Sequence, residues 1–369
     1  MSRRIAWTVV LALLAGIGAL PAPAGAESDG VWDYEPASVS GSYEPFVGDF
    51  AGDFASDVFW YAPGTGVDTL WIGAEGERTV TKEQFEVDAT KLVPVVGDFG
   101  GDTHDDIIWY QPGPGVDRLW IATGDETVFD TSRTVTLNGT YRPRVLQDYR
   151  EGNKDRVFWY RPGDGTDPLW IFNADATYTT VTNQIRSTLQ VIAGDWNGDG
   201  MEDLLLYGPG SLPDRLWRSR RGPFTSTNLS INGRYQATTV YAIPYDEVLF
   251  FGTGDNPDVY WHNSAGGFDS QPIYVPARGK AATAGLGAAI IYNPVGDDDV
   301  VIDDGDSAAA YALSDTHDIG SGKVLLIGDF DGDNFTDLVI YGPGTAGDQI
   351  WYGHNEENLV ARNRARGNG

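Results

Sequence analysis

Acidic nine-residue segments recur along the chain, with oxygen-bearing side chains at alternate positions. In the two fullest copies these side chains occupy positions 1, 3, 5 and 9, and position 7 offers its backbone carbonyl. Calcium takes six to eight oxygen ligands, and alternate residues of a tight loop can surround one ion. Glycine at position 4 or 6 permits the sharp bend that such a loop needs. The predicted ligands are Asp195, Asn197, Asp199, Met201 and Asp203 in one copy, and Asp329, Asp331, Asp333, Phe335 and Asp337 in the other.

Two further copies keep part of this ligand set. Their carboxylates are Asp49, Asp53 and Asp57 in one copy, and Asp98, Asp102 and Asp106 in the other. Position 3 is Ala51 or Gly100, so these are weaker calcium candidates, in which water would fill the vacancy. Another copy carries Arg150, Lys154 and Arg156, and we expect these positive charges to replace the ion. The two remaining copies, before Glu247 and Ala288, are degenerate and keep no ligand set.

The acidic segments belong to a longer repeat that contains a short apolar run. The residue before each run gives seven units at intervals between 41 and 50 residues. These residues are Asp57, Asp106, Arg156, Asp203, Glu247, Ala288 and Asp337. A period in the forties, made of short β-rich runs separated by Gly, Pro and Asp, is typical of one four-stranded propeller blade per unit. The sequence therefore predicts an all-β fold, a seven-bladed β-propeller of four-stranded blades.

The strands of one unit can be assigned from its pattern. The run Val58 to Tyr61 is apolar without alternation, which indicates a strand buried on both faces. Pro63 and the glycines after it predict a tight turn. A third strand at Leu70 to Ile72 and a polar outer strand near residues 79–87 complete the unit.

The ends of the chain suggest how the ring closes. Residues 37–43 resemble the segment 135–141 that precedes a later repeat, so we expect the N-terminal strand to complete the last blade, with Val39 near Ile350. Residues 359–361 are the alternative. The predicted division is a signal peptide at 1–26, a linker at 27–36, one propeller at 37–354 and a polar, disordered tail at 355–369.

The N-terminus has the three parts of a secretory signal. Arg3 and Arg4 precede an apolar run at 5–20, and small residues at 24–26 form a cleavage site. We therefore expect a secreted protein that begins at Glu27, without membrane insertion after cleavage; a retained signal anchor is the alternative. The chain has no cysteine, so its stability must come from a large core or from bound ions.

Charge narrows the choice of partner. The formal net charge is -28, and removal of the two signal arginines gives 23 - 53 = -30. Nucleic acids are bound by clustered Lys and Arg, so this acidity argues against a nucleic-acid partner. It fits a solvated surface, cation binding or both.

The segment from Asp195 to Asp203 and the segment from Asp329 to Asp337, each followed by an apolar strand and Gly-Pro-Gly, resemble the FG-GAP/VCBS repeat family. The resemblance covers about residues 47–353. This family, which includes the propeller of integrin α chains and many bacterial exported proteins, implies a β-propeller whose acidic loops bind calcium.

Other recurring residues have a structural and a functional interpretation. An aspartate before each third strand is expected to bond nearby backbone amides in a turn: Asp68, Asp117, Asp167, Asp214, Asp258 and Asp348. Tryptophans in the strands are expected to fill the space between blades, while a subset at the rim could stack on sugars: Trp60, Trp71, Trp109, Trp120, Trp159, Trp170, Trp217, Trp261 and Trp351. The four histidines, His104, His262, His317 and His354, share no metal-ligand spacing.

No sequence motif of a hydrolase, zinc enzyme or phosphate-binding protein is present. The sequence therefore favours a calcium-binding, non-enzymatic module for a glycan or an extracellular protein. A polysaccharide lyase and a purely structural or adhesive protein are the alternatives. Fold alone decides none of these, because unrelated functions share one fold.

Overall fold

The computed structural model describes residues 32–353 with short gaps. The gaps are 75–76, 88–90, 124–128, 151, 153, 174, 221–222, 243, 253–255, 265–266, 274–279, 286–287, 293–299, 304–308, 313–318, 320 and 345–346. The expected signal peptide, the C-terminal tail, His317 and His354 therefore lie outside the described residues. Within this part of the chain, no helix is long and apolar enough to span a membrane.

The strands form seven four-stranded antiparallel sheets, which we number as blades in chain order. Blade 1 contains β2 (Glu44–Gly48), β3 (Asp57–Tyr61), β4 (Asp68–Ala74) and β5 (Glu77–Phe85). Blade 2 contains β6 (Val93–Gly97), β7 (Asp106–Tyr110), β8 (Asp117–Ala122) and β9 (Phe129–Val135). Blade 3 contains β10 (Arg142–Leu146), β11 (Arg156–Tyr160), β12 (Asp167–Phe172) and β13 (Tyr178–Asn183). Blade 4 contains β14 (Gln190–Gly194), β15 (Asp203–Tyr207), β16 (Asp214–Arg218) and β17 (Thr225–Leu229).

The remaining strands make three more blades. Blade 5 contains β18 (Tyr235–Val240), β19 (Glu247–Gly252), β20 (Asp258–Ser264) and β21 (Gly267–Ile273). Blade 6 contains β22 (Lys280–Gly285), β23 (Ala288–Tyr292), β24 (Val300–Asp303) and β25 (Ala309–Ala312). Blade 7 contains β26 (Val324–Gly328), β27 (Asp337–Tyr341) and β28 (Asp348–Gly353), and its outer strand is β1 (Trp32–Ala37).

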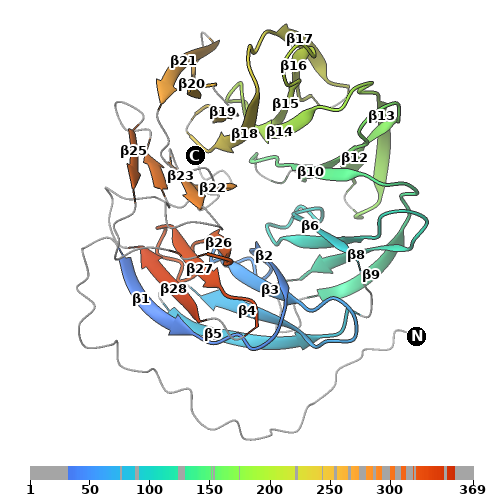
Figure 1. Ribbon diagram of the computed structural model, residues 1–369. Coiled ribbons are helices and arrows are strands. Elements are labelled where there is room, and N and C mark those ends of the chain that lie inside the picture. Colours follow the sequence, from blue (N-terminus) through green and yellow to red (C-terminus); the bar gives the residue numbers. More distant parts are fainter. Residues whose placement is uncertain are drawn as a thin grey trace, which may run out of the picture.

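The blades are arranged in a closed ring. The inner strands contact one another in the order β2, β6, β10, β14, β18, β22 and β26, and β26 contacts β2. Figure 1 shows the sheets around this ring, with β1 from the blue end of the chain beside β28 from the red end. A ring of this kind leaves only short outer edges open to solvent.

The N-terminal strand completes the last blade, as expected, but it is made of earlier residues than predicted. β1 pairs antiparallel with β28, with Trp32 opposite Gly353 and Ala37 opposite Asp348. The expectation that Val39 would lie in this strand is wrong, because Val39 follows it. The expected linker at 27–36 is wrong for the same reason, since residues 32–36 belong to the sheet. Blade 7 already has four strands in the described part of the chain, so residues 359–361 are not needed to complete it.

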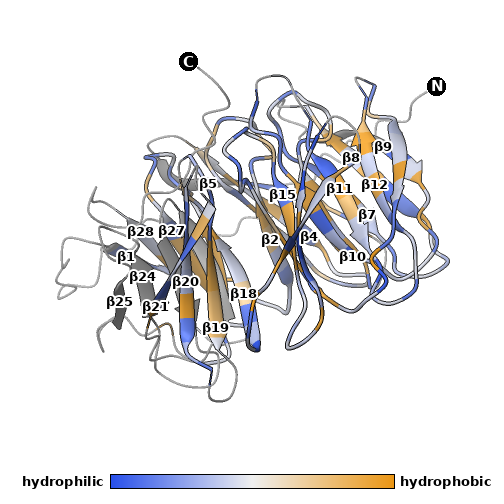
Figure 2. Ribbon diagram, turned by 90° about the horizontal axis from the view of Figure 1, so that it is seen from above, coloured by the Kyte–Doolittle hydropathy of each residue, from blue (hydrophilic) through white to orange (hydrophobic). Residues whose placement is uncertain are grey.

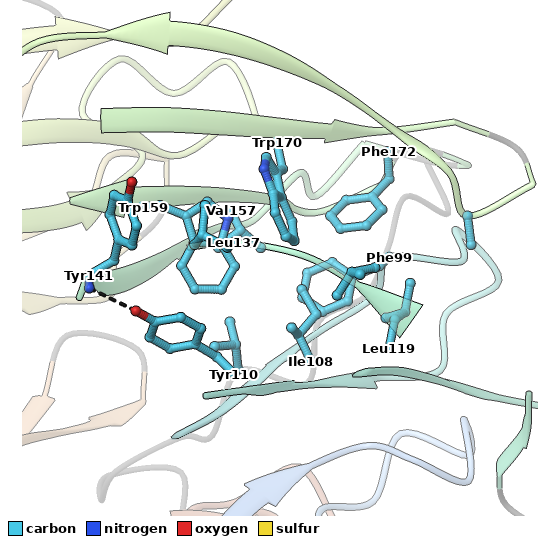
Figure 3. Close-up of a cluster of buried hydrophobic side chains, with 13 residues drawn as sticks. Phe99, Ile108, Tyr110, Leu119, Leu137, Tyr141, Val157, Trp159, Trp170 and Phe172 are labelled. Atoms are coloured by element: carbon cyan, nitrogen blue, oxygen red, sulfur yellow. Dashed lines mark hydrogen bonds between the residues drawn. The ribbon is translucent and has the colours of Figure 1, made fainter. Parts of the chain in front are cut away.

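The second strand of each described blade lies between two neighbouring sheets. Every residue of β3, β7, β11, β15, β19 and β27 is buried. Figure 2 shows hydrophobic residues concentrated within strands such as β19. Figure 3 shows the seam between blades 2 and 3, where Trp159 and Trp170 pack close to Phe99 and Ile108. Burial on both faces explains why these runs lack polar alternation.

Candidate functional site

The acidic segments connect the inner strand of a blade to its second strand, and so all lie on one face of the ring. We name them by blade: loop 1 (49–57), loop 2 (98–106), loop 3 (148–156), loop 4 (195–203) and loop 7 (329–337). In blades 5 and 6 the corresponding connections carry no acidic ligand set.

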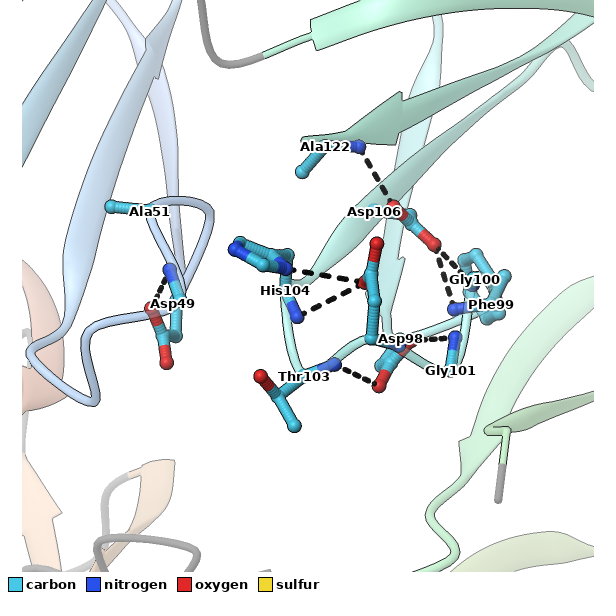
Figure 4. Close-up of polar contacts among 12 residues, drawn as sticks. Asp49, Ala51, Asp98, Phe99, Gly100, Gly101, Thr103, His104, Asp106 and Ala122 are labelled. Atoms are coloured by element: carbon cyan, nitrogen blue, oxygen red, sulfur yellow. Dashed lines mark hydrogen bonds and ion pairs between the residues drawn. The ribbon is translucent and has the colours of Figure 1, made fainter. Parts of the chain in front are cut away.

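Two carboxylates, at positions 1 and 9, organise the backbone of each intact loop. In loop 2, Asp98 accepts hydrogen bonds from the N–H groups of Gly101 and, at 2.9 Å, Thr103. Asp106 accepts the N–H groups of Phe99 at 2.8 Å and Gly100 at 2.7 Å, as Figure 4 shows. Its second oxygen accepts the N–H of Ala122 from the third strand at 2.8 Å. Loops 1, 4 and 7 repeat the main features of this pattern.

The backbone bends at positions 4 and 6 of each intact loop. Position 4 is glycine throughout, with φ between 68° and 79°. Position 6 also has positive φ, but it is a glycine only in loop 4, where Gly200 has φ 80°. The other position 6 residues are Phe54, Thr103 and Asn334, with φ of 72°, 80° and 73°. The loops therefore have one shape although their sequences differ at the bend.

Loop 7 gathers the densest carboxylate cluster found among the described residues. One oxygen from each of Asp329, Asp331 and Asp333 lies within 4.8 Å of the others. Burial, with repulsion from Asp333 and Asp331, raises the pKa of Asp329 to about 7. Burial and repulsion from Asp331 raise the pKa of Asp337 to about 8. Carboxylates that resist ionisation together would ionise readily around a divalent cation.

Loop 4 has a similar donor set with one amide. Asn197 Nδ2 donates to Asp203 Oδ2 at 3.1 Å, and Met201 N–H donates to Asp199 Oδ1 at 3.0 Å. Burial, with repulsion from Asp199 and Asp195, raises the pKa of Asp203 to about 7. Burial also raises the pKa of Asp195. Among the described residues, the carboxylates of Asp195, Asp199 and Asp203 do not lie as close together as those of loop 7.

Loops 1 and 2 retain the organising carboxylates and lack a side-chain oxygen at position 3. Burial raises the pKa of Asp49 to about 7, with repulsion from Asp105 as the second cause. Burial raises the pKa of Asp106 to about 8. Asp53 and Asp102 at position 5 accept the N–H groups of Ala55 at 3.1 Å and His104 at 3.3 Å.

Loop 3 carries a protein cation in place of an ion. Arg150 at position 3 binds Asp148 at position 1 through Nε at 2.7 Å and Nη2 at 2.5 Å. Lys154 and Arg156 reach neighbouring blades instead, donating to the carbonyls of Gly100 and Glu202 respectively. One of the three predicted positive charges therefore occupies the loop. In loop 3 the guanidinium of Arg150 therefore lies beside the position 1 carboxylate.

In blades 1 to 5 the residue before the second strand, position 8 where there is an acidic loop, joins its blade to the preceding one, a role not expected from the sequence. Asp246 N–H donates to Asp195 O at 3.0 Å, and Asp246 Oδ2 accepts Asp195 N–H at 2.7 Å. The equivalent pairs are Asp105 with Asp49, Asp155 with Asp98, Glu202 with Gln147 and Ser56 with Asp329. The available signal was the recurrence of a polar residue at position 8, directly before the residue that begins each second strand.

The aspartates before the third strands bond backbone amides, as expected, and each spans more of its blade than one turn. Asp117 accepts the N–H of Gln111 at 2.8 Å and that of Leu137 at 2.7 Å. Asp68, Asp167, Asp214 and Asp348 make the same two bonds, and Asp258 makes the first of them. These carboxylates are structural.

A pocket of about 540 Å³ lies between blades 4 and 5. Aromatic side chains on its wall are Trp196 of loop 4, Tyr245, Trp261 of β20 and Phe268 of β21. Polar side chains there include Asn197, Thr227, Asn263, Ser264 and Ser270. Among the described lining residues, Arg218 alone is charged, although the chain as a whole is strongly acidic.

The outer strands of blades 1 and 4 differ at the residue that lies beside this tryptophan position. In the seam between blades 1 and 2, the last residue of the outer strand is Phe85, whose ring centre lies 6.0 Å from that of Trp120. Leu229 holds the same place in blade 4, opposite the aspartate that begins the third strand. Trp261 corresponds to Trp120, and the residue beside it is smaller in blade 4 than in blade 1. Val135 holds the same place in blade 2, where the seam with blade 3 is packed, so the size of this residue is one contribution to the space.

Most of the other predicted tryptophans belong to the core. The exposed fraction is at most 8% for Trp60, Trp71, Trp109, Trp159, Trp170, Trp217 and Trp351. Trp261 is half-buried and lines the pocket, as expected for a rim subset, whereas Trp120 is half-buried within a filled seam. Trp196 also lines the pocket, a role that the sequence did not predict. The available signal was that position 2 is tryptophan in loop 4 but phenylalanine in loops 1, 2 and 7.

The described histidines form no catalytic arrangement with the pocket. His262 contacts Glu247 Oε1 and Gln271 Oε1, each at 3.2 Å, and does not line the pocket. His104 Nδ1 lies 3.3 Å from Asp102 Oδ1 at the surface of loop 2.

Solved structures similar to this chain are β-propellers of diverse function. A lectin from Agrocybe aegerita that recognises non-reducing terminal N-acetylglucosamine is 15% identical, with a TM-score of 0.55 over 75% of this chain and 81% of its own. A virginiamycin B lyase from Staphylococcus aureus with quinupristin is 10% identical, with a TM-score of 0.52 over 87% and 99%. YCF48 bound to a D1 peptide is 11% identical, with a TM-score of 0.52 over 91% and 100%.

No protein-family model and no curated protein sequence matches the chain. At these identities the structural likeness establishes the fold and leaves the function to the site. The chain is a β-propeller, and its FG-GAP/VCBS resemblance rests on its sequence motifs alone.

Proposed function

We propose that this protein is a secreted, calcium-binding propeller of the FG-GAP/VCBS type that binds a glycan without acting on it. The observation that carries the proposal is the pocket between blades 4 and 5, where aromatic rings and uncharged polar side chains share one wall. Pyranose rings present an apolar face and a rim of hydroxyls, and this wall offers partners for both.

The pocket provides a stacking surface that is fixed by packing. The ring centres of Trp261 and Phe268 lie 5.0 Å apart, and those of Trp261 and Phe250 lie 4.8 Å apart. Because Phe250 is buried, Trp261 is supported from behind and keeps its orientation. A sugar that stacks on a supported ring loses little binding energy to reorganisation of the protein.

Calcium is assigned a structural role in this proposal. Loops 4 and 7 supply oxygen ligands only, which suits a hard cation, and their carboxylates would be stabilised in the ionised state by the ion. The carboxylates at positions 1 and 9 accept backbone N–H groups and so fix the loop conformation before an ion binds. Loops 1 and 2 are weaker sites.

The test is a glycan array followed by an assay for new reducing ends. We expect binding without turnover by the parent protein in calcium, and loss of binding by Trp261→Ala. The matched control is Trp120→Ala, at the equivalent strand position of blade 2, which should lose stability but keep binding. Cleavage of a bound glycan would replace this proposal with a polysaccharide lyase. Absence of any glycan signal would reject glycan binding and leave a protein ligand or a structural role.

A further inference from the structure

We infer that loop 4 and the pocket between blades 4 and 5 form one coupled site, in which a cation held by loop 4 strengthens the binding of a sugar in the pocket. This inference deepens the glycan-binding function proposed above and rests on it. It concerns loop 4 alone among the acidic loops.

Two residues belong to both sites. Trp196 and Asn197 are positions 2 and 3 of loop 4, and both line the pocket. Asn197 Nδ2 donates to Asp203 Oδ2 at 3.1 Å, so the pocket wall is bonded to the position 9 carboxylate of the loop. A cation that takes Asn197 as a ligand would fix the side chain that faces the sugar.

The opposite wall is attached to the same loop. Asn263 of blade 5 lines the pocket, and its Nδ2 donates to Trp196 O at 2.9 Å and to Asp246 O at 3.1 Å. Asp246 is in turn bonded in both directions to the backbone of Asp195, position 1 of the loop. The loop therefore holds the two walls together.

The loop also packs closely against the pocket residue Tyr245. A Cβ atom added at Gly198 would lie 2.7 Å from Tyr245 Cε1, which is closer than side chains approach. A shift of the loop must therefore move Tyr245 or separate the two blades. Because packed contacts transmit displacement, the ordered loop favours one arrangement of the pocket.

The other loops provide internal controls. Loop 7 has the same position 1, 5 and 9 carboxylates, and no residue of it lines the pocket. A cation in loop 7 is expected to stabilise the fold without changing the pocket. Coupling of this kind is reciprocal, so a sugar in the pocket must tighten cation binding by the same factor.

Hydrogen exchange with calcium alone tests the coupling without any sugar. We expect calcium to slow backbone exchange about tenfold in residues 258–264 and 267–273, which contain no predicted ligand, in the parent and in Asp333→Ala. Asp199→Ala should show no such protection. Where that variant fails to fold, Asp199→Asn keeps an oxygen for the Met201 N–H and should show reduced protection. Equal protection in parent and Asp199→Ala, or none in the parent, would overturn the inference.

A titration with the strongest-binding array glycan then separates this inference from the proposed function. We expect removal of calcium to weaken binding about tenfold in the parent and in Asp333→Ala, and to have no further effect in Asp199→Ala. Glycan binding that is the same with calcium or chelator would keep the proposed function and reject the coupling. If calcium protects blade 5 from exchange but no glycan binds in the titration, the coupling of loop and pocket is kept and the glycan-binding function is rejected.

Discussion

Asp348 Oδ2 accepts the N–H of Val39 at 2.7 Å, a bond between residues 309 positions apart. The same bond links Asp68 to Val87 at 2.6 Å and Asp117 to Leu137 at 2.7 Å within blades 1 and 2. Val39 therefore stands directly after an outer strand, and β1 completes the last blade as β5 and β9 complete theirs.

Deletion of Trp32–Ala37 tests this closure. It would remove the whole outer strand of blade 7 and expose the edge of β28, which invites association between chains. We expect a lower melting temperature and concentration-dependent aggregation, measured by calorimetry and light scattering. A deletion variant that melts like the parent would show that β1 contributes nothing to the ring.

Replacement of Phe54 by glycine should stabilise the protein. Phe54 has φ 72° and is 48% exposed, so its side chain gains little from burial while its backbone is strained. Relief of roughly 1–2 kcal/mol of strain is partly offset by the greater freedom of glycine in the unfolded chain. We expect a gain of about 0.5 kcal/mol in urea unfolding.

The control for that variant is Val67→Gly. Val67 is 49% exposed, and its φ is not positive. It should lose stability, because it gains freedom in the unfolded chain without relief of strain. Loss of stability in both variants would mean that the bend at position 6 is unstrained.

Stability without calcium should fall as the pH rises. Asp337 and Asp329 have folded pKa values of about 8 and 7, against an ordinary aspartate pKa of 3.8, so the folded state binds more protons between these limits. Stability is then greatest below about pH 4 with respect to these groups and is lost as the pH rises toward 8. We expect the melting temperature in chelator to be lower at pH 8 than at pH 5.

Calcium should reverse that trend, because it binds the ionised carboxylates. With a dissociation constant on the order of 0.1 mM, as in extracellular modules, 1 mM calcium adds about 1.4 kcal/mol per site. The gain in melting temperature with calcium should therefore be larger at pH 8 than at pH 5. An equal gain at both values would argue that these carboxylates are not the ligands.

Asp331→Arg should make loop 7 resemble loop 3, in which an arginine side chain binds the position 1 carboxylate. In loop 3 the guanidinium of Arg150 binds the carboxylate of Asp148 at position 1, and Asp331 stands at the same position 3. We expect one calcium ion fewer per chain by calorimetric titration, with a melting temperature in chelator at or above that of the parent. An unchanged stoichiometry would place no ion in loop 7.

Much of the fold could be predicted from the sequence because burial on both faces leaves a strong pattern. The second strands begin at the residue before each apolar run, as at Asp57 and Asp337, which are the position 9 carboxylates of their loops. The closing strand was misplaced because residues 37–43 resemble the connection after an outer strand rather than the strand itself. β1 is polar and contains Pro36, which an edge strand tolerates.

The candidate site was predicted in part. The spacing of carboxylates identifies the acidic loops, because local backbone turns bring alternate side chains together. The pocket could not be predicted, because its walls come from residues of different blades, such as Leu229 and Trp261. Contacts between position 8 and the preceding blade were missed for the same reason.

The most direct test of the account is a calorimetric titration of the strongest-binding array glycan into the parent and into Leu229→Phe, in calcium. The variant restores the residue type that fills the equivalent seam between blades 1 and 2, so it should fill the pocket while the fold is kept. The matched control is Phe85→Leu, which should lower stability and leave affinity unchanged. We expect Leu229→Phe to melt within a few degrees of the parent and to bind the glycan at least about tenfold more weakly. Equal affinity of parent and Leu229→Phe would contradict the assignment of this pocket as the glycan site.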